Sequence, residues 1–172
     1  VADANAVLVD NRFPEFVTAV CRAAQGRKIP IVIDLDQATK LDDPLLALGT
    51  HVVASTEALF GMTGSNDYED ALRALSTHLS SFVAITDGPK GVYWLEGGEL
   101  RHLPAFNVDV IDSLGAGDAF HGGFTLGLVE GRALPDILRF ASATAALKCT
   151  KFGGASGAPM RADVEAFLKQ RC

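Results

Sequence analysis

The sequence predicts an α/β protein built on a mostly parallel sheet, and three observations support this prediction. Short apolar runs rich in β-branched residues, such as 29–35 and 82–86, are typical of strands buried on both faces. Segments with the apolar spacing of helices separate these runs. The alternation favours parallel strands joined by right-handed crossovers, which place helices on both faces of the sheet.

The first half of the chain supplies most of the expected sheet. Pro14 opens a helical pattern that stops at Gly26, because proline suits a helix start and glycine suits its end. Asp42, Asp43 and Pro44 open a short helix through Leu48. The predicted strands are 6–10, 29–35, 51–55 and 82–86, and the further helices are 56–62 and 67–79.

The second half is expected to be largely helical. Residues 92–103 form a hairpin around Gly97 and Gly98. An alternating apolar run at Phe106, Val108 and Val110 predicts a strand that leads into the segment DSLGAGD. Helices are expected at 116–130, 135–150 and 161–170. We find no internal repeat and no linker, so residues 1–172 are expected to form a single portion of one domain.

Composition excludes several classes of function. The chain has 172 residues with 48% apolar and 21% charged residues, which argues against disorder. The net charge is −6 with no basic run, so nucleic acid is not expected as a partner. No apolar stretch approaches the roughly 20 residues of a membrane span. The cysteines, Cys21, Cys149 and Cys172, are far apart and indicate reduced thiols in a cytoplasmic protein, with Cys149 in the core.

The segment DSLGAGD, residues 112–118, carries the strongest chemical signal. Gly115, Ala116 and Gly117 stand where a strand is expected to meet a helix. Backbone N–H groups can converge there on an anion, and the helix adds a partial positive charge. Asp118 has two interpretations, which the pattern leaves open. It caps the helix, or it is a general base that takes a proton from an attacking hydroxyl.

Two further segments are open to two interpretations each. Gly122, Gly123 and Gly127 in one helix, and the run FASATAAL in the next, suit close helix packing or a slot for a flat adenine ring. The loop TDGPKG at 86–91 suits an ordinary turn or a second part of a nucleotide site.

These segments resemble signatures of the PfkB, or ribokinase-like, sugar kinases. DSLGAGDAFHGGF resembles the family's D-T-x-G-A-G-D motif, and ITDGPKG resembles its T-x-G-x-x-G nucleotide loop. FASATAALKCTKFGG, followed by Pro159, resembles its C-terminal adenine-side helix and loop. The order matches the family, and the local sequence looks most similar to the sulfofructose kinase group. The resemblance implies a ribokinase-like three-layer α/β/α fold.

The resemblance also implies a role for each motif residue. Asp118 would deprotonate a hydroxyl of a small sugar, and the amides of Gly115, Ala116 and Gly117 would hold the γ-phosphate of ATP. Mg²⁺ would accompany ATP, and many members bind K⁺ near the anion hole. The residues implied for the nucleotide are Thr86, Gly88, Gly91, Ser142 and Glu57, and those implied for K⁺ are Asp112, Leu114, Lys151, Gly153 and Gly157.

The sequence departs from the family pattern in three places. Ser113 replaces a threonine, and the family's N-x-x-E motif reads Ala54-Ser55-Thr56-Glu57, which puts the positioning of magnesium in doubt unless Ser55 compensates. The N-terminal part that carries most sugar-binding residues, and a lid that often forms a homodimer, is expected to be missing. A nucleotide-binding module without catalysis is therefore the alternative to a kinase. A dinucleotide-dependent dehydrogenase is disfavoured, because no G-x-G-x-x-G follows the early strands.

Two smaller groups are judged structural or left open. His121 is expected to be a packed or surface histidine rather than a catalytic one. Asp10, Asn11 and Arg12 follow the first strand, and they either touch substrate or form a surface turn.

Overall fold

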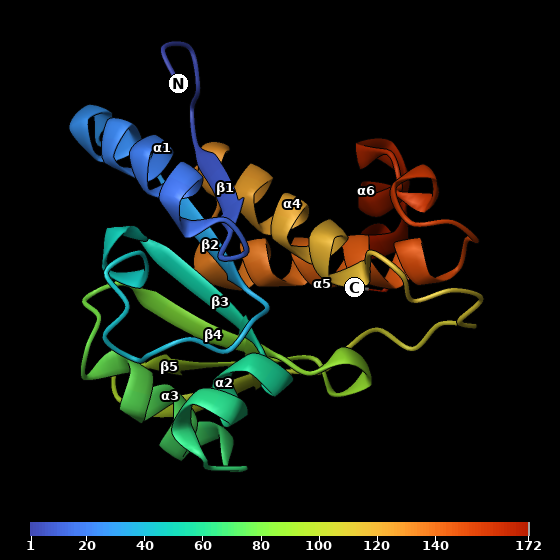
Figure 1. Ribbon diagram of the computed structural model, residues 1–172. Helices are drawn as coiled ribbons and strands as arrows, with labels where there is room; N and C mark the ends of the chain where they lie inside the picture. The colour runs from blue at the N-terminus through green and yellow to red at the C-terminus, as the bar shows by residue number, and fades with distance from the viewer. Residues whose placement is uncertain (172) are drawn as a thin grey trace. The chain divides into compact units, whose positions relative to one another are not determined.

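The computed structural model describes residues 1–171, and these fall into two compact units. The first unit contains residues 1–87 and 92–102, and the second contains residues 88–91 and 103–171 (Figure 1). The expectation that the chain is a single portion of one domain stays a prediction. Cys172 lies outside the described residues.

The first unit is built on a six-stranded sheet with the order β1-β2-β3-β4-β5-β6. Strands β1 to β4 pair in parallel, and β5 pairs antiparallel with β4, so the prediction of a mostly parallel α/β sheet is confirmed. In register, Asp10 lies opposite Asp34 and Ser55 opposite Thr86, so these strands end at one edge. The strands are β1 (Val7–Asp10), β2 (Ile31–Leu35), β3 (His51–Ser55), β4 (Phe82–Thr86), β5 (Val92–Glu96) and β6 (Glu99–Leu103).

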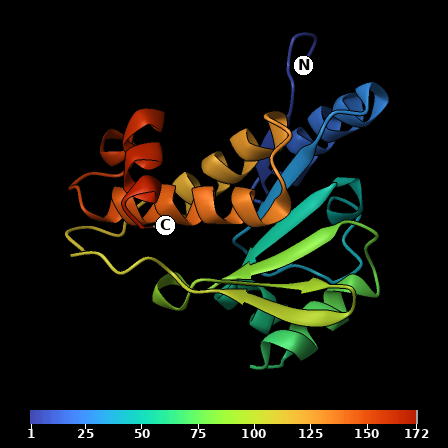
Figure 2. The ribbon, with the colours of Figure 1, turned by 180° about the vertical axis from the view of Figure 1, so that it is seen from behind.

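Helices α1 (Pro14–Arg27), α2 (Thr56–Thr63) and α3 (Tyr68–Ser76) cover one face of this sheet (Figure 2). Cys21 of α1, Leu59 of α2 and Leu72 of α3 belong to one apolar cluster with Ile33 and Ile85 of the strands. Proline starts α1, and the side chains of Ser55 and Asp67 cap α2 and α3. Local sequence signals therefore set the ends of these helices.

The helix expected at 42–48 is wrong in extent, because only a short 3₁₀ turn forms at Leu46–Leu48. The Asp43 carboxylate accepts hydrogen bonds from the Leu45 N–H at 2.9 Å and the Thr39 hydroxyl at 2.6 Å. Such side-chain bonds stabilise a turn in place of a regular helix.

The second unit is helical. It contains η2 (Gly88–Lys90), α4 (Ala116–Val129), α5 (Leu134–Cys149), η3 (Ala155–Gly157) and α6 (Arg161–Lys169). Helices α4 and α5 pack closely, since a Cβ at Gly123 would lie 2.9 Å from Thr144 Oγ1 and 3.1 Å from Ala141 Cα. A Cβ at Gly127 would lie 3.0 Å from Ile137 Cγ1. Close packing therefore explains both glycines. None of the helices within residues 1–171 is both long and apolar enough to cross a membrane.

The strand expected around Phe106, Val108 and Val110 does not form. Phe106 and Val108 pack against the apolar cluster of α5 and α6, and the Phe106 ring meets Phe167 edge-on at 5.2 Å between centroids. Val110 is exposed. An alternating pattern directs one face toward an apolar surface, and here helices supply that surface in place of neighbouring strands.

Candidate functional site

The site is built around the turn that leads into α4. Gly115 precedes the helix with φ of 79°, in the left-handed region that glycine adopts most easily. The Asp112 carboxylate accepts a hydrogen bond from the Leu114 N–H at 2.9 Å, and the Ala116 N–H donates to Ser113 O at 3.1 Å. These bonds fold residues 112–116 into a tight turn that presents the start of the helix.

Backbone N–H groups are available at this helix start. Within residues 1–171, the amides of Gly115, Gly117 and Asp118 have no acceptor. Of the expected trio Gly115, Ala116 and Gly117, the Ala116 amide already donates to Ser113 O, whereas the neighbouring Asp118 amide is unpaired. Unpaired amides and the helix dipole make such a start attractive to anions.

Asp118 is not the capping residue, because Gly115 holds that position and the helix has no side-chain capping bond. Its carboxylate is exposed and has no hydrogen-bond or ion-pair partner among the described residues. The Oδ2 atom lies 3.7 Å from the position of a Cβ built on Gly115, so the carboxylate lies beside the turn. Both residues line a cavity of about 380 Å³ in the second unit, a size within the range of small-molecule sites.

Asp112 ties this turn to the loop that follows α5. Its Oδ2 accepts a hydrogen bond from the Gly153 N–H at 2.8 Å, and its backbone oxygen accepts one from Lys148 Nζ at 2.8 Å. The amides of Leu114 and Gly153, helped by the Lys148 ammonium, hold the pKa of the Asp112 carboxyl below its ordinary value. Asp112 is therefore an ionised junction between two loops.

The residues implied for K⁺ do not fit that ion. Both Asp112 carboxylate oxygens accept backbone N–H groups, and Lys148 Nζ lies 3.5 Å from Oδ2. Two unit charges 4 Å apart repel by about 4 kcal/mol at an effective dielectric constant near 20. Gly157 lies against the Lys148 side chain, since a Cβ on Gly157 would be 3.3 Å from Lys148 Cε, and the same Cβ would be 3.4 Å from Lys151 O. The Lys148 ammonium thus already pairs with Asp112, one of the expected ligands.

Sequence reasoning missed Lys148. The surrounding run was interpreted as a surface for close helix packing or for an adenine ring, although a lysine among Ala146, Leu147 and Cys149 is a signal. A charged residue on a buried helix face requires a partner.

The nucleotide-loop residues are placed in both units. In the first unit, the Thr86 hydroxyl donates to Ala54 O at 3.3 Å. In the second, the Gly91 N–H donates to Gly88 O at 3.2 Å, and a Cβ on Gly91 would lie 2.1 Å from Leu103 O. Backbone packing alone therefore requires glycine at position 91. Ser142 is buried in α5 and does not line the cavity of Asp118.

Glu57 lies in the first turn of α2 with its side chain exposed. The Ser55 hydroxyl accepts the Ala58 N–H at 3.1 Å as the helix cap, so it is engaged in holding the helix. Ala54 is fully buried and offers no side-chain oxygen. One exposed carboxylate fits Mg²⁺ that arrives with a nucleotide, because such Mg²⁺ takes most ligands from phosphate and water.

The remaining singled-out residues have structural partners. His121 is buried, with Nδ1 2.8 Å from Gly117 O. Asn11 Nδ2 donates to Gln37 O at 2.7 Å, and Arg12 Nε donates to Asp36 at 3.0 Å, which supports a surface turn at this point.

Burial raises the pKa of the Cys21 thiol. Cys149 is half-buried rather than fully in the core.

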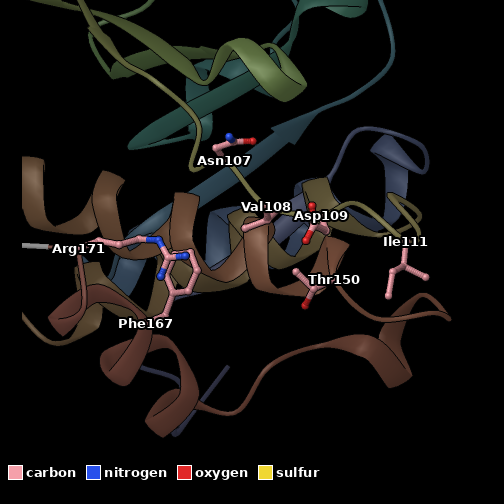
Figure 3. Close-up of a pocket in the computed structure, with 7 residues that line it drawn as sticks. All are labelled: Asn107, Val108, Asp109, Ile111, Thr150, Phe167 and Arg171. Carbon is pink, nitrogen blue, oxygen red and sulfur yellow. The ribbon is translucent and has the colours of Figure 1, made fainter.

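A second cavity of about 420 Å³ lies between residues 107–111, Thr150 and α6 (Figure 3). The Arg171 guanidinium lies over the Phe167 ring, 3.8 Å from its centroid, and the view shows both side chains at the wall of the cavity. None of the predicted site residues lines this cavity, so we place the candidate site at Asp118.

Comparison with known proteins identifies a family of carbohydrate kinases. The model of the family described as "pfkB family carbohydrate kinase" matches residues 3–161. The chain is 30% identical over 163 residues to a ribokinase of Bacillus subtilis, covering 94% of this chain and 54% of that protein. It spans about half the length of the curated relatives it matches.

Solved structures of ribokinases share the fold of this chain. A protein of Agrobacterium tumefaciens provisionally classed as a ribokinase superposes with a TM-score of 0.92 at 36% identity, over 99% of this chain and 57% of that one. The Arabidopsis thaliana ribokinase complexed with ribose and ATP superposes with a TM-score of 0.86 at 26% identity, over 96% of this chain and 56% of that one. The fold is therefore ribokinase-like. The subgroup likeness to sulfofructose kinases stays a prediction.

Proposed function

The chain belongs to the pfkB family of carbohydrate kinases, and from this premise we propose that it supplies the phosphoryl-transfer site of an ATP-dependent sugar kinase. In this proposal Asp118 is the general base, and the amides of Gly115, Gly117 and Asp118 bind the γ-phosphate. The acceptor is a hydroxyl group of a small sugar or sugar derivative.

One observation supports the proposal above the others. Among the described residues, a carboxylate without a partner lies beside unpaired helix-start amides, and Asp118 and Gly115 line the same cavity. A phosphate site alone gains nothing from a nearby negative charge, which repels the ligand. A phosphoryl-transfer site needs both features, because the amides stabilise the transferring group while the carboxylate accepts the proton.

The chemistry follows from these positions. The sugar hydroxyl oxygen attacks the γ-phosphorus, the bond from that phosphorus to the leaving oxygen of ADP breaks, and the hydroxyl proton goes to Asp118. The amides at the start of α4 stabilise the charge on the transferring group. The Asp112 junction keeps these amides in place, since it fixes the turn that carries them.

The nucleotide is ATP in this proposal, with Thr86, Gly88 and Gly91 along its phosphates and ribose. Mg²⁺ bound to its phosphates would neutralise their charge, and Glu57 is the residue that would hold it. Ser142 is buried in α5, so it can contact the adenine only if the ring reaches that part of the helix. A homodimer and a cytoplasmic location remain predictions.

The test is ADP release measured with the complete gene product and a panel of pentoses, hexoses and nucleosides. We expect ADP release that depends on one acceptor, and calorimetric binding of ATP. ATP binding with no acceptor-dependent ADP release across the panel would favour the alternative, a nucleotide-binding module without catalysis. Ala54, which is buried and offers no side-chain oxygen, is the observation that favours that alternative. An assay of residues 1–172 alone, run alongside, shows how much of the activity this chain supplies.

A further inference from the structure

Lys148 carries a charge that is unusual in its surroundings. Its residue is 0% exposed, and among the described residues no other lysine, arginine, aspartate or glutamate is fully buried. It lies in the last turn of α5, on the cavity that also contains Asp118. Burying an ammonium group is costly unless partners compensate it, so its position calls for a physical reason.

The Lys148 ammonium pairs with Asp112, which lies in the turn before the proposed anion hole. Nζ donates to Asp112 O at 2.8 Å and lies 3.5 Å from Asp112 Oδ2. The same carboxylate receives the amides of Leu114 and Gly153. The ammonium therefore offsets the charge of the Asp112 carboxylate, which joins residues 112–117 to the loop after α5.

This arrangement performs the task of a bound cation. A cation at this point would collect oxygens from Asp112 and the loop after α5, and would place positive charge on the cavity that Gly115 and Asp118 line. Lys148 contributes that charge covalently, and a second cation beside it would be repelled. The Gly157 backbone leaves room for the lysine stem, since a Cβ there would be only 3.3 Å from Lys148 Cε.

We propose that the Lys148 ammonium replaces a monovalent cation at this site, so that phosphoryl transfer by this protein does not depend on K⁺. The inference rests on the proposed function for its activity readout. Lys148 acts here as a positioning residue, because it touches Asp112 rather than the reacting groups.

The activity test uses the complete gene product at constant ionic strength, with K⁺, Na⁺ or tetramethylammonium as the only monovalent cation. We expect equal turnover of the wild type in all three. We expect Lys148→Met to lose most turnover in tetramethylammonium and to regain part of it in K⁺, because K⁺ can enter the space that the ammonium leaves. Lys169→Met removes an exposed lysine of α6 and is the matched control, with no cation dependence.

A thermal-melting readout separates this inference from the proposed function. A ligand that binds only the folded state raises the melting temperature. K⁺ should therefore raise the melting temperature of Lys148→Met above its value in tetramethylammonium, and leave the wild type unchanged, whether or not a sugar substrate is found. Wild-type turnover or melting that responds to K⁺ but not to Na⁺ overturns the inference. This wild-type measurement decides the matter even when Lys148→Met does not fold.

Discussion

Replacing Asp118 by asparagine separates its proposed chemical role from its effect on the helix. Asp118 lies in the first turn of α4, where a negative charge interacts favourably with the helix dipole. That interaction contributes about 0.3–1 kcal/mol at exposed positions. The side chain is exposed and has no partner within residues 1–171, so Asp118→Asn removes no other folded-state contact. The free energy of unfolding should fall by less than about 1 kcal/mol.

The expected loss of turnover is much larger. A positioned general base contributes about 10²–10⁴-fold to the rate, which corresponds to about 3–5 kcal/mol in the activation free energy. ATP affinity should stay the same or increase, since the substitution removes a negative charge beside the phosphate site. Asp118→Asn should therefore lower kcat and leave both ATP binding and folding nearly intact.

Asp136 provides a matched control for this experiment. It is an exposed aspartate in the first turn of α5, the helix that packs against α4. Asp136→Asn should cost a similar amount of stability and leave kcat unchanged. The assays are ADP release, calorimetry with ATP and urea denaturation of the complete gene product. Turnover of Asp118→Asn within about threefold of the wild type would refute the base assignment, because a positioned base is worth at least about 10²-fold.

Three further predictions concern the structure around the site. Gly123→Ala should lower the free energy of unfolding, measured by urea denaturation, by about 1–3 kcal/mol, because its Cβ would crowd Thr144 and Ala141. Gly122→Ala, whose Cβ would meet open space, should raise that free energy by up to about 1 kcal/mol. Equal effects of the two substitutions would contradict the close packing of α4 against α5. The pKa of Asp112 is lowered in the folded state, so its stabilisation is complete above the ordinary carboxyl pKa of about 3.9 and is lost as the pH falls further. The destabilisation by Asp112→Asn in thermal melts should therefore shrink below about pH 4, and a constant difference would exclude this linkage. Ser55→Ala should lower the free energy of unfolding by about 1 kcal/mol, because the α2 cap is lost. The Mg²⁺ concentration needed for half-maximal activity should not change. A changed Mg²⁺ requirement would assign Ser55 to the metal.

Local sequence patterns predicted most of the secondary structure. The apolar runs at 51–55 and 82–86 are strands with the predicted ends, and the hairpin turns at Gly97 and Gly98. The predicted starts of α4 and α6 also match. These signals succeed because caps, glycines and side-chain periodicity act between residues that are near in the chain.

The errors came from patterns that two environments satisfy equally well. Residues 106–110 alternate as a strand does, but helices provide the apolar surface that they contact. Asp43 was assigned to a helix start, although its carboxylate holds a turn. In both cases the residue types are compatible with two structures, and the neighbours decide between them.

Chain sequence alone determined that Gly115, Gly117 and Asp118 occupy one turn of structure, since adjacent residues at a helix start are necessarily close in space. It could not determine what surrounds that turn. Lys148 and Gly153 follow Asp112 by 36 and 41 residues in the sequence. The length, rotation and packing of two helices bring these residues into contact. No short pattern encodes that geometry, so only the packing of the helices shows that the buried Lys148 ammonium pairs with Asp112 beside the proposed anion hole.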